Sequence, residues 1–286
     1  MRRVLTAVAF LFIVGARLLP AQPSSALPAA PNSLKFAVIG DNGTGDSPQY
    51  DIGARMNEAR HDFPFDLVIM LGDNLYGRQG PDDFVSKFEK PYAMLLQGGV
   101  RFFASLGNHD NPDNRSYTGF NMNGERYYTF VRKNARFVVL DTNQLDPRQL
   151  AWMEATLKQS TENWKICYFH HPIYSDGGRH GSDVQLRVAL EPLFVKYGVS
   201  IVLTGHDHFY ERVKPQKGIT YFVTGSGGQL RPGNIDRSTG LTAAGNDTDN
   251  VFMVAEIVGD QMIFQAISRA GKVVDAGSIM RRKDNK

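Results

Sequence analysis

The sequence has very little cysteine: Cys167 is the only one in 286 residues. A single cysteine excludes an intramolecular disulfide, so the fold must be stabilised by its hydrophobic core, which a chain of this length can build. Cys167 lies in the apolar run 166–169. We therefore expect a buried, inert thiol rather than a catalytic or redox-active one.

The sequence also has little net charge outside its first residues. The formal charge is +3, but Arg2, Arg3 and Arg17 all lie within residues 1–26, which contain no acidic residue. The remainder is formally neutral and gives no electrostatic basis for binding nucleic acid.

The N-terminal apolar run is too short to span a bilayer comfortably. It covers residues 4–16, follows Met1-Arg2-Arg3 and ends at Arg17. A positive start and a short apolar run are typical of a signal peptide, which we assign to residues 1–26, followed by a linker at 27–33. An uncleaved anchor is the alternative. We expect an exported protein, periplasmic or secreted, with no stable membrane association after signal removal.

The rest of the chain lacks internal repeats and any linker that would divide it. Hydrophobic residues at 42% and charged residues at 21% are globular values. We predict one monomeric domain over residues 34–280 and a short tail at 281–286. Strands are predicted at 34–40, 66–71, 100–106, 127–131, 136–141, 165–169 and 200–203, and helices at 50–60, 81–96, 147–157 and 184–197. From residue 208 to 279 the pattern favours further strands.

Helix 81–96 offers four candidate core residues, Phe84, Phe88, Met94 and Leu95. They recur at spacings that one face of a helix can bury.

Five segments share one design, in which a predicted strand ends and polar side chains follow within a few residues. The segments are Gly40-Asp41-Asn42-Gly43, Gly72-Asp73-Asn74-Leu75-Tyr76, Gly107-Asn108-His109-Asp110, His170-His171-Pro172 and Gly205-His206-Asp207-His208. Five of the seven histidines lie in them, and His180 lies just beyond one. Because ligands in α/β sheets bind beyond the carboxyl ends of strands, we expect these segments to converge on one site.

The side chains in these segments indicate a metal centre. Carboxylate, phenol, imidazole and amide groups without a thiolate favour iron, zinc or manganese. A phenolate such as that of Tyr76 suits a hard trivalent ion, so Fe(III) is its natural partner. One carboxylate can bridge two ions, and two-metal sites suit phosphoryl transfer to water.

With these motifs in order, the chain from about residue 34 to 279 resembles the purple acid phosphatases of the metallophosphoesterase superfamily, especially the small tartrate-resistant type. Many relatives in the superfamily have a histidine two positions after the first aspartate. This chain has Gly43 there and supplies Tyr76 instead, which is the pattern of the purple enzymes. The resemblance implies a four-layer α/β/β/α sandwich of two mixed sheets.

The resemblance also implies a role for each residue of the motifs. By position, Asp41, Tyr76 and His208 would hold Fe(III), and Asp73 would bridge. The second ion would be Fe(II), Zn or Mn, held by Asn108, His170 and His206. His170 matches the ligand because it stands two residues before Pro172, and His171 would be its neighbour. His109 and His180 would be the catalytic, substrate-contacting histidines.

Two features depart from the mammalian members of that family. They have a glutamate immediately before the second substrate-contacting histidine, where this chain has Arg179. A cation there would favour phosphate binding and disfavour a carboxylic acid. The long exposed loop of the mammalian type is replaced by the short segment 142–146, and the family's disulfide is missing.

The resemblance implies an acid phosphatase that hydrolyses small phosphate monoesters by attack of a metal-bound hydroxide on phosphorus. A phosphodiesterase or nucleotidase using the same metal site is the nearest alternative. A metal-binding or iron-storage protein without turnover is the alternative from another class.

Overall fold

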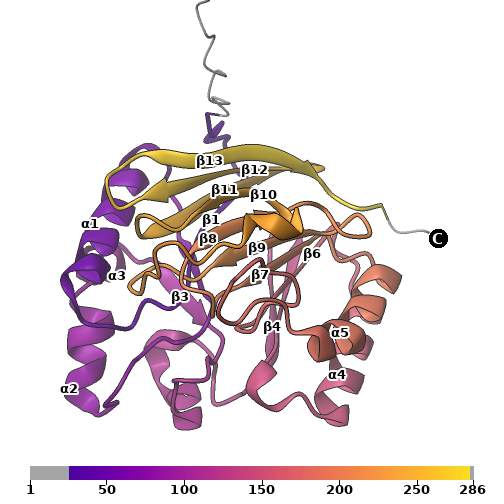
Figure 1. Ribbon diagram of the computed structural model, residues 1–286, viewed down its shortest axis with the longest axis horizontal. Coiled ribbons are helices and arrows are strands. Elements are labelled where there is room, and N and C mark those ends of the chain that lie inside the picture. The colour runs from indigo at the N-terminus through magenta and orange to yellow at the C-terminus, as the bar shows by residue number, and fades with distance from the viewer. Residues whose placement is uncertain (1–25, 284–286) are drawn as a thin grey trace, which may run out of the picture.

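Two mixed β-sheets form the centre of the computed structural model, which describes residues 26–283 (Figure 1). The first sheet has the strand order β13-β12-β11-β1-β2-β3, and the second has the order β10-β8-β9-β7-β6-β5-β4. The strands are β1 (Leu34–Ile39), β2 (Leu67–Met70), β3 (Arg101–Ala104), β4 (Tyr128–Arg132), β5 (Ala135–Val139), β6 (Trp164–Tyr168), β7 (Ile201–Thr204), β8 (Tyr210–Val213), β9 (Thr220–Thr224), β10 (Thr242–Asn246), β11 (Val251–Val258), β12 (Gln261–Ser268) and β13 (Val273–Met280).

Helices cover the two outer faces of the sheets. They are α1 (Ser47–Asp62), α2 (Pro81–Phe84), α3 (Ala93–Gln97), α4 (Pro147–Gln159) and α5 (Val184–Lys196). Figure 1 shows α1 to α3 on one side of the molecule and α4 and α5 on the other. Ile52 and Met56 of α1 pack with the outer residues of β1 and β2. Met153 of α4 and Leu190 of α5 pack with the outer residues of the second sheet. The molecule is thus the expected four-layer α/β/β/α sandwich.

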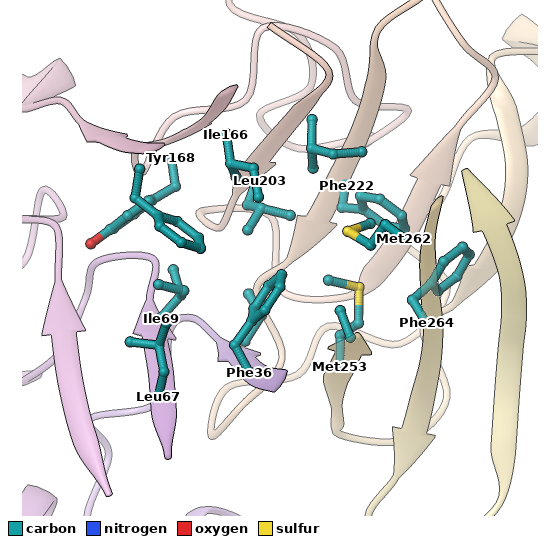
Figure 2. Close-up of a cluster of buried hydrophobic side chains, with 14 of the residues drawn as sticks. Phe36, Leu67, Ile69, Ile166, Tyr168, Leu203, Phe222, Met253, Met262 and Phe264 are labelled. Atoms are coloured by element: carbon teal, nitrogen blue, oxygen red, sulfur yellow. The ribbon is translucent and has the colours of Figure 1, made fainter. Parts of the chain in front are cut away.

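The main core lies between the two sheets. Alternate residues of each strand point inward, so that Phe36 and Ile69 of the first sheet face Ile166 and Phe222 of the second (Figure 2). These side chains are fully buried. At about 25 cal/mol per Å² of apolar surface removed from water, such burial is the main source of stability in a domain without disulfides. Cys167 is buried and free, as predicted.

Parallel pairing brings the strand ends to one edge. β1 pairs with β2 and β2 with β3 in parallel, and in the second sheet β5, β6, β7 and β9 are successive parallel neighbours. Residues directly after these strands therefore gather where the two sheets meet. This is the side at which ligands bind in open α/β sheets.

The prediction of one continuous helix over 81–96 is wrong. The segment forms α2, a π-helical turn at Val85–Glu89 and then α3. Pro91 explains the interruption, because proline cannot donate a backbone hydrogen bond and clashes with the preceding turn. After the break Met94 points outward and is 61% exposed, so its assignment to the core is also wrong, whereas Phe88 and Leu95 are buried as expected.

Both ends of the described chain contact the domain. The amides of Ala29 and Ala30 donate hydrogen bonds to the Glu256 carboxylate of β11, at 2.8 and 2.7 Å. Arg281, in the predicted tail, pairs with Asp260 at 2.6 Å. The predicted signal peptide lies almost wholly outside the described residues. Among residues 26–283, no helix is long and apolar enough to cross a membrane.

Candidate metal centre

All five strand-end segments meet at the edge between the sheets. The loops that follow β1, β2, β3, β6 and β7 carry Asp41, Asp73 with Tyr76, Asn108 with His109, His170, and His206 with His208, respectively. Backbone bonds join neighbouring loops: the Asp41 amide donates to the Gly72 carbonyl at 3.0 Å, and the Gly205 amide to the His170 carbonyl at 3.0 Å.

The backbone at this edge is strained. Asp41, Asp73 and His206 all have positive φ angles, of 52°, 52° and 70°. Left-handed conformations of non-glycine residues cost of the order of 1 kcal/mol each and are concentrated at functional sites. The loops also approach one another very closely, because a Cβ on Gly107 would lie 2.2 Å from the Asp73 amide nitrogen and from its Oδ1. Only glycine fits at position 107.

One set of ligand atoms comes from the first sheet and from the loop after β7. The Tyr76 hydroxyl lies 3.2 Å from Asp41 Oδ1 and 3.3 Å from His208 Nε2, and these last two atoms are 3.5 Å apart. Ligands held about 2.1 Å from one ion are separated by about 3.0–3.4 Å in octahedral or tetrahedral geometry. The three atoms therefore have the spacing of ligands to a single ion.

A second set lies beside the first. His170 Nε2 is 3.0 Å from Asn108 Oδ1 and 3.1 Å from His206 Nδ1. The other ring nitrogen of His170 donates to the Leu71 carbonyl at 2.9 Å, which leaves Nε2 with a free lone pair. A hydrogen bond of this kind orients metal-binding histidines and fixes their tautomer.

Asp73 lies between the two sets. Its Oδ1 is 3.5 Å from His170 Nε2 of the second set. Burial raises the pKa of Tyr76 in the first set, and the Asp73 carboxylate raises it further by its charge and by a hydrogen bond. Asp41, Asp73 and His208 together present ligand atoms within 4.8 Å of one another. A carboxylate in this position can contact both ions of a two-metal site.

The electrostatics of these residues fit a bound cation. Burial and the neighbouring imidazoles lower the pKa of His206 to about 2, and burial with the charge of Arg231 lowers the pKa of His208 to about 4. Both imidazoles are thus neutral and free to coordinate. Burial, followed by the charge of Asp73, raises the pKa of Asp41. Positive charge is what such a group of buried acids and neutral imidazoles needs.

Three further histidines, His109, His171 and His180, lie close to the ligand atoms, whereas His61 lies at the end of α1. The His109 amide donates to Asp73 Oδ1 at 2.9 Å, and its ring packs against Tyr76 with centroids 4.8 Å apart. The His180 ring lies 4.3 Å from that of His206. His171 is also close to His206, at 4.5 Å, and its Nδ1 lies 2.8 Å from the Thr142 hydroxyl. Its ring can therefore supply a ligand atom beside His170 and His206.

Sequence reasoning missed the residues that hold these loops in place. Asp110 accepts hydrogen bonds from the amides of Gly107, Asn74 and Leu75, at 2.9 to 3.1 Å. Asp207 accepts from the Ser175 hydroxyl at 2.6 Å and from the Gly181 amide at 3.2 Å. Both lie inside the motifs, but a carboxylate that binds amides and one that binds metal look alike in a sequence.

Comparison with known proteins agrees with this geometry. Residues 34–210 match the calcineurin-like phosphoesterase family. The chain is 27% identical to human tartrate-resistant acid phosphatase type 5 over 265 residues, which cover 78% of this chain and 80% of the human protein. It is 30% identical to purple acid phosphatase 3 of Arabidopsis thaliana over 68% of this chain and 63% of the plant protein.

A solved structure supports the fold assignment. The chain superimposes on purple acid phosphatase PPD1 of yellow lupin with a TM-score of 0.72 and 20% sequence identity, over 90% of this chain and 55% of the lupin chain. A family match over more than half the chain, together with the ligand sets around Asp73, establishes that this protein is a member of the calcineurin-like phosphoesterase family.

Proposed function

We propose that this protein is a binuclear-metal acid phosphatase that hydrolyses phosphate monoesters. The observation that carries the proposal is the pair of adjacent ligand sets that share Asp73, with Tyr76 in one of them. The relatives with names that specify a reaction, including the human and Arabidopsis proteins, are acid phosphatases.

The ligand chemistry favours different ions at the two positions. Asp41, Tyr76 and His208 combine two anionic oxygen ligands with one imidazole, which suits Fe(III). Asn108, His170 and His206 are neutral and suit a divalent ion, Fe(II), Zn or Mn. When bound, the two ions would activate water at acidic pH and neutralise the phosphoryl oxygens.

The chain's own residues would position the ester and assist its cleavage. The His109 ring packs against Tyr76 of the first ligand set, and the His180 ring packs against His206 of the second. We assign them to orienting the ester and donating a proton to the departing alkoxide. Their replacement by alanine should reduce kcat for alkyl phosphates more than for p-nitrophenyl phosphate, because p-nitrophenolate leaves without a proton. Equal losses for both substrates would contradict the proton-donor role.

The proposal is tested by metal analysis combined with a substrate panel. The iron-loaded protein should contain two metal ions per chain and release phosphate from p-nitrophenyl phosphate with an acidic optimum. Turnover of bis(p-nitrophenyl) phosphate at a higher kcat/KM than the monoester would identify a phosphodiesterase instead. Two bound metals without any phosphate release would identify a metal-binding protein.

A further inference from the structure

His109, one of the two histidines assigned to the departing alkoxide, has an exposed side chain. Its ring packs against Tyr76, with centroids 4.8 Å apart. Exposed side chains change rotamer within picoseconds to nanoseconds, so the place of this imidazole beside the metal centre depends on how firmly the backbone at residue 109 is held.

The backbone of His109 is held on both sides. Its amide donates to Oδ1 of Asp73, the carboxylate between the two ligand sets, at 2.9 Å. Its carbonyl accepts a hydrogen bond from Nε2 of Gln79, at 2.6 Å. The first contact belongs to the metal centre, whereas the second comes from a residue that supplies no metal ligand. Gln79 follows Tyr76 in the loop between β2 and α2.

The Gln79 carboxamide forms four hydrogen bonds. Besides the His109 carbonyl, its Nε2 binds the Leu75 carbonyl at 2.9 Å. Its Oε1 accepts from the Asn111 amide and from the side-chain amide of Asn114, each at 2.7 Å. Two carbonyls on one side and two N–H groups on the other allow a single orientation of the carboxamide. Gln79 therefore joins the loop after β2 to the loop after β3.

The segment that carries Gln79 is itself firmly held. Lys87, in the π-helical turn between α2 and α3, donates to the carbonyls of Tyr76 and Arg78 at 2.7 and 2.8 Å, and it pairs with Asp83 at 2.9 Å. Turns of this kind are frequent at functional sites. Because the three residues before Gln79 are fixed in this way, its carboxamide is presented at a defined place.

The rest of the loop after β3 has its own anchor. Asp110 accepts the amides of Gly107, Asn74 and Leu75, as described above. This loop should therefore stay docked when Gln79 is replaced. The loss should be confined to the residues that Gln79 contacts.

We propose that Gln79 is a positioning residue for His109, which holds the His109 carbonyl so that the imidazole stays on Tyr76 and beside the leaving group. This inference rests on the proposed phosphatase function. A displacement of about 1 Å can cost roughly a hundredfold in rate. Gln79 should matter most for esters of aliphatic alcohols, whose departure needs the proton that His109 is assigned to supply.

The first test uses two variants that keep the length of the side chain. Gln79→Met removes all four hydrogen bonds and should lower kcat for ethyl phosphate by roughly tenfold to hundredfold, and lower it less for p-nitrophenyl phosphate. Gln79→Glu, ionised at about pH 6, still accepts from Asn111 and Asn114 but turns a carboxylate oxygen toward the His109 carbonyl. It should behave like Gln79→Met. Full activity of Gln79→Glu would show that Gln79 only ties the loops together.

The second test asks whether Gln79 acts through His109. In a His109→Ala background, Gln79→Met should cause no further loss of kcat for ethyl phosphate, because two residues that act through one group are not additive. Gln159→Met is the matched control, at an exposed glutamine at the end of α4, and should leave both substrates unaffected. Losses that multiply in the double variant would overturn the positioning role.

The position of the imidazole can also be measured without turnover. In the zinc-loaded protein, packing on Tyr76 shifts the proton resonances of the His109 ring through the ring current. In Gln79→Met these resonances should move toward the values of a freely exposed histidine, while zinc content and the thermal midpoint exclude a folding defect. Unchanged His109 resonances would overturn the inference. Failure of every substrate to release phosphate would instead refute the proposed function, and the His109 resonances would still decide the role of Gln79.

Discussion

At the scale of single residues, Tyr76 has the most unusual surroundings. Burial raises the pKa of its hydroxyl, and the charges of Asp41 and Asp73 raise it further. Alone, this phenol would stay protonated at any physiological pH. A highly charged cation between the three groups reverses that preference, because it stabilises phenolate and carboxylates together. We therefore expect a trivalent ion rather than a divalent one beside Tyr76.

The first prediction concerns colour. A phenolate bound to Fe(III) transfers charge to the metal on absorbing visible light, so the iron-loaded protein should be violet to pink. Tyr76→Phe should lose this band, while Asp41 and His208 still hold some iron. Mild reductant should leave the colour of the unmodified protein unchanged. A visible spectrum together with iron analysis decides it: an unchanged band in Tyr76→Phe, or bound iron without a band, would show that Tyr76 is not a ligand.

A second prediction concerns the shared carboxylate. Because Asp73 lies between the ligand sets, Asp73→Ala should lose both metals, whereas Asn108→Ala should weaken mainly the second site. Elemental analysis after dialysis against metal-free buffer measures both. Two metals per chain retained in Asp73→Ala would contradict the bridging role. Asp113→Ala is a useful control, because this aspartate is exposed and forms its ion pair with Arg115 rather than with a residue of the ligand sets.

At the scale of elements, β8 carries a buried glutamate whose titration should affect stability. The Glu211 carboxylate accepts the Asp176 amide at 3.0 Å, and the Thr242 hydroxyl lies within hydrogen-bond distance of both carboxylates. One hydroxyl proton cannot serve two carboxylates, so a proton on Glu211 completes the network. Burial raises the pKa of Glu211 to about 7. The hydrogen bonds from Thr242 and Asp176 lower this pKa, and the charges of Asp176 and Asp207 raise it.

The third prediction follows from the sign of that shift. Below the pKa that Glu211 has in the unfolded chain, its protonated carboxyl makes its full contribution to the free energy of unfolding. That contribution is lost as the pH rises to about 7, the pKa of Glu211 in the folded protein. Glu211→Gln keeps a hydrogen-bonding neutral side chain. The unfolding free energy of this variant relative to the unmodified protein should therefore rise by about 1–3 kcal/mol between pH 5 and pH 8.

Urea unfolding of the metal-free protein at each pH measures the difference. Comparing variant with unmodified protein cancels the contribution of the metal-site histidines, whose lowered pKa values act in the opposite direction. Glu125→Gln, at an exposed glutamate, should show no such pH dependence. A relative stability of Glu211→Gln that stays flat from pH 5 to pH 8 would refute the assigned titration.

At the scale of the whole molecule, the sequence predicted the architecture because the relevant signals were local. Each of the strands leading to Asp41, Asp73, Asn108, His170 and His206 is short, apolar and followed at once by polar residues. The family's residue order then implied the four layers. Features that depend on contacts distant in sequence were missed. One example is the hydrogen bond from the Arg231 amide to the His208 carbonyl, at 2.9 Å, which no local pattern marks. The break in the helix expected over 81–96 was missed for another reason, because its cause, Pro91, is local and visible in the sequence.

The N-terminal segment is a further long-range feature, and it constrains the expected export signal. Glu256 is fully buried on β11, and its carboxylate is satisfied by the Ala29 and Ala30 amides, the Ser33 hydroxyl and the Lys35 ammonium, which lies 3.6 Å away. A buried carboxylate that loses such partners costs several kcal/mol. Removal of the chain as far as residue 33 would therefore take away three of these four partners and leave the buried carboxylate with Lys35 alone.

The last prediction is that the exported protein begins between about residues 22 and 28, so that Ala29 and Ala30 are retained. A chain starting at Leu34 should be less stable than one starting at Leu27 by about 2–4 kcal/mol, as judged by urea unfolding. Adding Glu256→Gln to the shorter chain should recover part of the loss, because a neutral amide needs fewer donors. N-terminal sequencing of the periplasmic or secreted protein locates the natural start. A start beyond Ala30 with full stability would contradict the role of Glu256, and intact Met1 in the membrane fraction would contradict a cleaved signal.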